Sequence, residues 1–280
     1  MQFLPKFVIM IIKKDTVALS LGSCFSAEMG RRMAEAGMEV CVNPFGVLYN
    51  PASVASSLLR LADGRPFGPE DVIPRDTNPV REGRPRKAVS PEHRPIAPEG
   101  GGYVSFHHHG SFARKTPEEF LEHANAALAQ ASEAFRRARA VIITFGTAWV
   151  FRHLERDIIV SNCHKHPAWE FCRERLSVED IVSLWAPVLE RFGDRHFILT
   201  VSPIRHLKDG LHGNQLSKAT LLLAEDILVR THPNAEYFPS YEIIIDELRD
   251  RTWFEADGAH PTQAAVDIVW DRFKNAVQIL

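Results

Sequence analysis

The chain has 280 residues, of which 45% are hydrophobic and 24% are charged, proportions typical of a globular protein with one large domain or two small ones. Its 33 Lys and Arg residues nearly balance its 35 Asp and Glu residues, so the formal charge of -2 offers no general basic field to a nucleic acid or an anionic membrane. The longest apolar run, Phe7 to Ile12, is far shorter than the roughly 20 residues of a membrane-spanning helix. We expect this run to form a strand or a buried N-terminal segment.

Cysteine use indicates a reducing compartment. The four cysteines are too few and too scattered for a disulfide framework in a chain of this length; they are Cys24, Cys41, Cys163 and Cys172. No secretory signal peptide is recognisable, so the sequence predicts free thiols and a cytoplasmic protein.

Short apolar runs alternate with helical patterns along most of the chain, which is typical of a parallel sheet covered by helices. The expected strands are 17–21, 38–42, 140–145, 196–201 and 236–238. The expected helices are 26–36, a segment that begins at Asn50 and Pro51, 117–139, 177–192, 214–230 and a last segment that begins at Pro261. This order predicts a single doubly wound α/β domain of three layers over 1–280, with its site beyond the carboxyl ends of the strands.

Residues 64–102 interrupt this rhythm. Eight of the 18 prolines and six of the 16 glycines fall there, beside many arginines, which predicts an irregular insertion without regular elements. Loops of this length inside a compact domain are usually lids, binding loops or linkers. We favour a lid, because the segment before it is too short to be a complete domain.

A glycine and a small hydroxyl side chain, Gly22 and Ser23, follow the first expected strand at the turn into a helix. The amides at a helix N-terminus can stabilise the oxyanion that forms when a serine attacks an acyl carbon, so Ser23 is the candidate nucleophile. The alternative is that Ser23 or Ser26 only caps the helix, which is the commoner role of an isolated Gly-Ser pair.

The other end of the chain supplies an acid and a base three residues apart, Asp257 and His260, immediately before the last helix. On one tight turn the two side chains can face the same direction. His260 would then accept the proton of Ser23, while Asp257 fixes the tautomer of the imidazole. An Asp-x-x-His pair on its own is common and usually structural.

Taken together, these residues resemble the GSCFA domain family and, more widely, the SGNH or GDSL-like hydrolases. The resemblance covers about residues 19 to 265 in ordered blocks: 21–26 (LGSCFS), 43–51 (NPFGVLYNP), 106–112, 144–149 (TFGTAW), 162–165 (NCHK), 202–209 (SPIRHLKD) and 237–242 (YFPSYE). It implies a flavodoxin-like α/β/α fold in which Ser23 is the nucleophile, His260 is the base and Asp257 orients His260.

The resemblance also implies an oxyanion site that uses the backbone N–H groups of Ser23 and Gly46, although the segment 43–46 could equally be a simple turn. One departure stands out. The wider superfamily has Gly-x-Asn after the third strand, and its asparagine donates to the oxyanion, whereas this chain has Ala148 at that place. Asn162 and Thr147 are the candidates to replace the missing donor.

Arg205 and His206 follow the fourth expected strand, where substrate would lie, so they are candidate substrate contacts; alternatively they fix the loop through ion pairs. His109 is a third candidate, in a histidine run that either folds over the site or lies in a solvated loop. The histidines and cysteines near 163–166 suggest zinc, but their spacing is not a regular structural-zinc pattern. We therefore expect neither a metal nor another cofactor.

The sequence thus predicts a serine hydrolase that removes a small acyl group, such as acetyl, from a carbohydrate-like ester. An O-acyltransferase would use the same residues. Two alternatives stay open: zinc-assisted hydrolysis by His109, Cys163, His164 or His166, and a non-catalytic protein that binds a glycan or an acylated ligand. The oligomeric state is left open.

Overall fold

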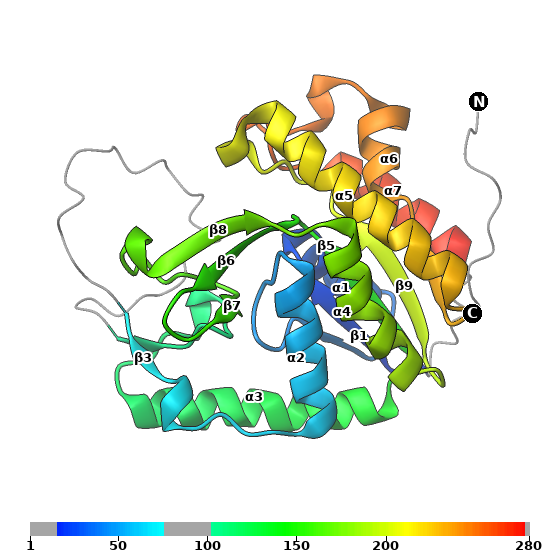
Figure 1. The fold of residues 1–280 in the computed structure, drawn as a ribbon. Coiled ribbons are helices and arrows are strands. Elements are labelled where there is room, and N and C mark those ends of the chain that lie inside the picture. Colours follow the sequence, from blue (N-terminus) through cyan, green and yellow to red (C-terminus); the bar gives the residue numbers. More distant parts are fainter. Residues whose placement is uncertain (1–15, 76–101, 278–280) are drawn as a thin grey trace.

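The computed structural model describes residues 16–75 and 102–277 and confirms the three-layer α/β/α fold (Figure 1). Five parallel strands form the main sheet: β1 (Ala18–Gly22), β2 (Val40–Val42), β5 (Ala140–Phe145), β9 (His196–Val201) and β10 (Ala235–Tyr237). Their spatial order is β10-β9-β5-β1-β2, which is the flavodoxin-like order 2-1-3-4-5 read from the opposite edge. The order of connection reverses between β1 and β5, so a site is expected at the carboxyl ends of these two strands.

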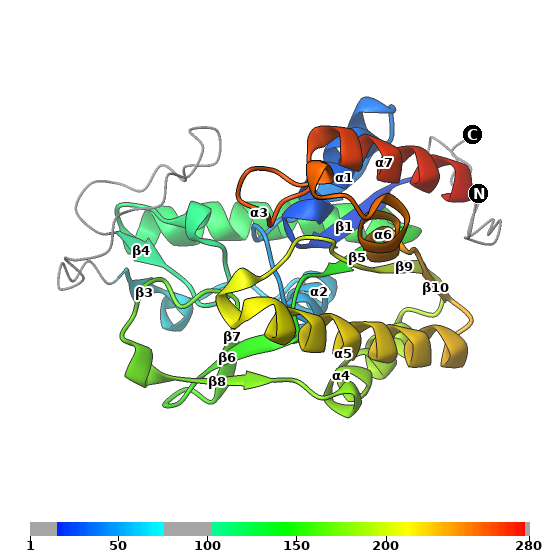
Figure 2. The ribbon, with the colours of Figure 1, turned by 90° about the horizontal axis from the view of Figure 1, so that it is seen from above.

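Helices cover both faces of the sheet. They are α1 (Cys24–Glu35), α2 (Pro51–Asp63), α3 (Pro117–Arg137), α4 (Val178–Arg191), α5 (Gly210–Thr231), a short α6 (Ser240–Glu242) that continues into a π-helical segment (Ile243–Leu248), and α7 (Gln263–Val277). One buried cluster joins α1, α7 and the π-helical segment to the sheet, and another joins α2, α3, α4 and α5 to it. Figure 2 shows α1 and α7 on one side and α4 and α5 on the other. With helices on both faces, β1 and β5 are buried throughout, which explains their continuous apolar runs.

Local signals explain where several helices begin and end. The Asn50 side chain accepts the N–H of Ser53 ahead of Pro51, and Ser177 forms a capping box with Asp180. These caps lie where the sequence predicts them.

The segment of chain between β5 and α4 forms a second sheet, which the sequence did not predict. It is antiparallel, has the order β7-β6-β8, and contains β6 (Trp149–His153), β7 (Ile158–Val160) and β8 (Phe171–Arg175). Its strands are short and largely half-exposed, so charged residues interrupt both the apolar runs and the alternation that mark a strand.

Two short elements lie in the described first part of residues 64–102, where the sequence predicts none. A 3-10 turn covers Pro69–Asp71, and β3 (Ile73–Pro74) pairs with β4 (Tyr103–Val104) in an antiparallel ladder. The apolar side chains of this ladder are buried in a small cluster around Phe106, which stabilises it. The interior of the segment, 76–101, for which the sequence predicts a lid, and the apolar run 7–12 lie outside the described residues. None of the helices within 16–75 and 102–277 combines the length and apolar character needed to cross a membrane.

Candidate active site

The candidate nucleophile lies at the carboxyl end of β1, next to β5, where the order of connection reverses. Ser23 directly follows β1 and is the N-cap of α1, with an extended backbone (φ −69°, ψ 178°). Its N–H donates to Thr144 O of β5 at 3.2 Å, and its Oγ accepts the N–H of Phe25 at 3.2 Å. The capping role that the sequence left as the alternative is therefore present. It also holds the hydroxyl at the positive end of a 12-residue helix, where negative charge is stabilised.

Gly22 allows β1 to approach β5 closely at this point. It has a φ of +142°, and a Cβ at this position would lie 2.2 Å from Thr144 O. Its own N–H donates to Asn43 Oδ1 at 2.8 Å, and its carbonyl accepts the N–H of Leu48 at 2.8 Å. The main chain before Ser23 is thus fixed to β5 on one side and to the loop after β2 on the other.

The acid and base candidates lie on one tight turn. His260 Nδ1 is 2.6 Å from Asp257 Oδ2, and Asp257 Oδ1 accepts the backbone N–H groups of Ala259 at 2.8 Å and His260 at 3.0 Å. Gly258 gives the turn its left-handed residue, with a φ of +66°. Burial opposes ionisation of Asp257, but these hydrogen bonds outweigh it and lower its pKa to about 2. The carboxylate therefore holds the proton of His260 on Nδ1 and leaves Nε2 as the basic atom.

Arg205 fixes this turn to the sheet. Its backbone N–H donates to Ala259 O at 3.1 Å and its Nη1 donates to Gly258 O at 3.2 Å. Its guanidinium also lies 3.8 Å from the centre of the Phe254 ring. Of the two roles that the sequence left open for Arg205, these contacts support loop fixing, although carbonyls and an aromatic ring replace the expected ion pairs.

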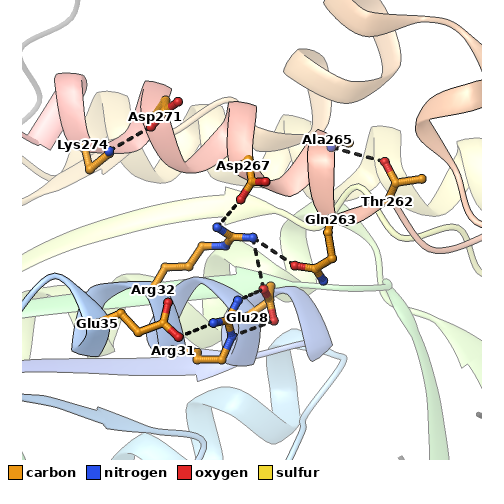
Figure 3. Close-up of polar contacts among 10 residues, drawn as sticks. All are labelled: Glu28, Arg31, Arg32, Glu35, Thr262, Gln263, Ala265, Asp267, Asp271 and Lys274. Carbon is orange, nitrogen blue, oxygen red and sulfur yellow. Dashed lines mark hydrogen bonds and ion pairs between the residues drawn. The ribbon is translucent and has the colours of Figure 1, made fainter. Parts of the chain in front are cut away.

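Two helices that follow the candidate triad residues are joined side by side (Figure 3). Arg32 of α1 pairs with Asp267 of α7, donates to Gln263 at 3.0 Å and lies 3.3 Å from Glu28. The Arg32 side chain is only 10% exposed, but that of Asp267 is 59% exposed, so solvent still screens this ion pair. Because α1 follows Ser23 and α7 follows the His260 turn, the contact holds the two helices that begin next to these residues side by side.

Ser23 and His260 differ in exposure. Ser23 is 1% exposed, whereas the side chain of His260 is 51% exposed. Within residues 16–75 and 102–277, no hydrogen bond joins Ser23 Oγ to the imidazole. Catalytic hydrogen bonds are often long without substrate and tighten only in the complex. Proton transfer from this arrangement requires the His260 ring to approach Ser23.

His206 lies at the same edge of the sheet. Its Nε2 is 3.3 Å from the position that a Cβ on Gly146 would occupy, and its ring meets Tyr49 edge to face with 5.8 Å between centres. Burial, together with the nearby charges of Lys218 and His260, lowers the pKa of His206 to about 4. The ring is therefore neutral at neutral pH and lies beside the residue that follows β5.

The main-chain donors expected for the oxyanion are bonded within the chain. Ser23 N–H donates to Thr144 O, as described above, and Gly46 N–H donates to Asn43 O at 2.7 Å. Gly46 has a φ of +78°, and a Cβ there would lie 2.3 Å from His109 Cβ. These features support a turn role for Gly46, which the sequence left as the alternative. The structure adds that the absence of a Cβ at Gly46 makes room for His109.

The two side chains suggested as replacement donors make other contacts. Thr147 Oγ1 lies 3.0 Å from Ser217 Oγ of α5 and accepts the N–H of Trp149 at 3.1 Å. Asn162, between β7 and β8, accepts the N–H of His164 at 2.8 Å. The structure does not bring Thr147 or Asn162 into a hydrogen bond with Ser23 in the part of the chain that it describes.

The residues of the zinc alternative have separate partners. His164 Nε2 is 2.7 Å from Ser105 O, and His109 Nδ1 is 3.0 Å from Ser111 Oγ. Burial raises the pKa of the Cys163 thiol to about 11, which disfavours the thiolate that metals bind. Among the residues that the structure describes, no group of three or more His, Cys, Asp or Glu side chains is arranged to hold a metal ion.

One buried lysine, which the sequence analysis missed, joins two strand ends. Lys218 of α5 is 1% exposed, and its Nζ donates to Gly146 O and Ser202 O, both at 2.6 Å. Burial lowers its pKa to about 7. Lys218 shares one helix face with Asn214 and Ser217, which bond to the His206 N–H and the Ala148 N–H. This spacing of three polar residues at i, i+3 and i+4 was the available signal of a buried polar face.

Comparison with known proteins places the chain in a family. Residues 17–273 match the GSCFA family. The chain belongs to the GSCFA family. The match spans both Ser23 and the Asp257–His260 turn, so the whole candidate site lies within the GSCFA region. No curated protein and no solved structure matches the chain.

Proposed function

We propose that this GSCFA protein is a serine esterase of the SGNH or GDSL-like superfamily, which removes a small acyl group such as acetyl from a carbohydrate-like alcohol. The observation that carries the proposal is the Asp257–His260 pair, 2.6 Å apart, on a turn that Arg205 ties to the edge of the sheet where Ser23 lies. A buried N-cap serine, an imidazole and an ionised carboxylate are the three groups that acyl transfer requires.

Exposure supports the choice of substrate class. Because Ser23 is 1% exposed, the acyl group that reaches it must be small. The side chain of His260 is half exposed, so the alcohol half of the ester lies toward solvent, where a hydroxyl-rich group keeps its hydration.

In the proposed mechanism, Ser23 Oγ attacks the acyl carbon while His260 Nε2 takes the hydroxyl proton. Asp257 stabilises the imidazolium that forms. The tetrahedral intermediate then expels the alcohol, which takes the proton from His260, and the acyl group stays on Ser23. Water next attacks the acyl-enzyme and gives a proton to His260, and the free acid leaves as Ser23 recovers its proton. If an acceptor hydroxyl replaces water, the same residues perform acyl transfer.

The test is intact-mass spectrometry after incubation with a fluorophosphonate, which traps activated serines. The expected result is a single adduct on Ser23 in the wild type and none in Ser23→Ala or His260→Ala. If the adduct forms, the rates of hydrolysis of a panel of acetylated sugars identify the substrate class. Adding alcohol acceptors then shows whether the acyl group is transferred to water or to the acceptor.

A second candidate function is supported by the burial of Ser23 and by its lack of a hydrogen bond to His260 within the described residues. It is a non-catalytic protein that binds a glycan or an acylated ligand. A folded wild type without any adduct, tested beside a control esterase that does react, would overturn the esterase. Ligand binding that is unchanged in Ser23→Ala would then support the binding protein.

We place the reaction in the cytoplasm. The four cysteines are all free thiols, which a reducing compartment preserves. Secretion of the active protein with disulfide-linked cysteines would contradict this location.

A further inference from the structure

Acyl transfer at Ser23 places negative charge on the carbonyl oxygen of the substrate, and preorganised donors around that oxygen supply much of the rate. The N–H groups of Ser23 and Gly46 already donate within the chain, at 3.2 Å and 2.7 Å. Ala148 is fully buried, and its N–H donates to Ser217 Oγ at 2.8 Å. A donor for the oxyanion is therefore needed from another side chain near Ser23.

Asn43 presents such a donor. Its Oδ1 accepts the N–H of Gly22, the residue directly before the nucleophile, at 2.8 Å. Its Nδ2 is buried and has no hydrogen-bond partner among residues 16–75 and 102–277. Because the Gly22 N–H is a donor, the carboxamide must turn its oxygen toward Gly22, so the unpaired atom is the donor nitrogen. Leaving such a donor buried and unpaired destabilises the folded protein, and a structural role at Gly22 alone does not explain it.

The backbone of Asn43 is held in place as firmly as its side chain. Its φ is +43°, in the left-handed region, which asparagine tolerates but which still costs energy. Its N–H donates to Ser20 O at 2.9 Å, and its carbonyl accepts the N–H of Gly46 at 2.7 Å. Strained residues of this kind concentrate at functional sites. The carboxamide is therefore preorganised beside Ser23 before any substrate binds.

We propose that Asn43 Nδ2 donates to the oxyanion during acyl transfer at Ser23, a proposal that rests on the esterase function above. Asn43, from the loop after β2, thus takes over the donation that Ala148 does not supply from the loop after β5. His206 Nε2 is another buried nitrogen without a partner at this edge, within the described residues. Its tautomer decides whether it donates or accepts, whereas the bond to Gly22 leaves Asn43 Nδ2 only one role.

The experiment compares Asn43→Asp and Asn43→Gly with the wild type. Asn43→Asp keeps an oxygen for the Gly22 N–H but removes the donor, and Asn43→Gly removes the carboxamide while suiting the left-handed backbone. Asn125→Asp is the matched control, because Asn125 Oδ1 also accepts a backbone N–H at 2.8 Å, from Phe67, and its Nδ2 donates to Phe67 O at 3.0 Å. Each protein is assayed for fluorophosphonate labelling of Ser23, for kcat and KM with p-nitrophenyl acetate, and for thermal unfolding.

The proposal predicts that kcat falls about 100- to 1000-fold in both Asn43 variants, with little change in KM, and that labelling slows in parallel. Asn125→Asp should keep the wild-type kcat. If Asn43→Asp keeps kcat within about threefold while the wild type is labelled, the Asn43 proposal fails and the esterase stands. If the wild type is not labelled at Ser23, the esterase itself fails. Loss of the fold in both Asn43 variants would assign Asn43 to the turn and overturn the proposal.

Discussion

Substituting Gly22 by alanine tests whether close approach of β1 and β5 positions the candidate nucleophile. The added Cβ would lie 2.2 Å from Thr144 O and 2.9 Å from Thr144 C, both backbone atoms of the neighbouring strand. A carbon and a carbonyl oxygen normally stay about 3.3 Å or more apart, so the strands must separate by about 1 Å. The hydrogen bond from Ser23 N–H to Thr144 O lies at the same place and would be stretched.

The expected loss of stability combines two effects. A side chain at positive φ costs about 1–2 kcal/mol, and crowding in a well-packed core costs about 1–3 kcal/mol more. Gly22→Ala should therefore lower the free energy of unfolding by about 2–5 kcal/mol. Gly37→Ala is the matched control, because Gly37 has a φ of +87° but no atom within 4 Å of an added Cβ. The control should lose only the backbone cost, about 1–2 kcal/mol.

Guanidinium unfolding followed by circular dichroism measures both variants, provided that the slope m stays unchanged. The excess loss in Gly22→Ala combines the contact with Thr144 and any difference in backbone cost between a φ of +142° at Gly22 and +87° at Gly37. Equal losses in Gly22→Ala and Gly37→Ala would show that the strands do not approach as closely as argued. Fluorophosphonate labelling adds a functional readout, since Gly22→Ala should also slow labelling of Ser23, whereas Gly37→Ala should not.

Three further changes test other parts of the site. Asp257→Asn keeps an oxygen for the N–H groups of the turn but removes the charge that fixes the His260 tautomer. Fluorophosphonate labelling of Ser23 should therefore slow about 10³–10⁴-fold. Labelling at the wild-type rate would contradict this role of Asp257. Arg205→Lys keeps the backbone hydrogen bond to Ala259 O but loses the guanidinium contacts with Gly258 O and Phe254, so labelling should slow by roughly tenfold or more, with little change in melting temperature; labelling at the wild-type rate would contradict this role. Burial lowers the pKa of Lys218 from 10.5 to about 7. Between these two pH values the unfolded state binds more protons than the folded state, so the free energy of unfolding rises with pH, by at most about 5 kcal/mol in total. Lys218→Met should lose this rise, and parallel pH–stability curves for the two proteins would refute the argument.

The main sheet could be predicted because its strands and helices follow local rules. β5 and β9 are continuous apolar runs, and the helices around them begin at strong caps such as Ser177. The small sheet of β6, β7 and β8 could not be predicted in this way. Its strands β6 and β8 pair across a long connection, and buried and half-exposed positions alternate only weakly along them. A turn around Asp157, between two runs of β-branched and aromatic residues, was the signal that remained.

The site divides in the same way. Ser23, Asp257 and His260 lie next to the ends of regular elements, so their neighbours in sequence are also their neighbours in space. Asn43 and Lys218 differ, because their roles depend on strands that are distant in sequence. From the sequence alone, Asn43 is predicted to be a turn residue and Lys218 a solvated position on a helix. Only the folded sheet brings the Gly22 N–H to Asn43 and the strand-end carbonyls to Lys218.

The energetics of Lys218 support the same location for the candidate site, independently of Ser23, Asp257 and His260. Burying an ammonium costs several kcal/mol, and a methionine would fill a similar volume without that cost. What methionine lacks is a donor that joins Gly146 O after β5 to Ser202 O after β9, each at 2.6 Å. These two bonds set the spacing of neighbouring strand ends and hold Gly146 beneath His206. A strained, half-paired Asn43 lies at the same edge. Proteins tolerate such costs mainly at functional sites, so these two residues support the proposal that the functional site lies at the carboxyl edge of the sheet, between β2 and β9.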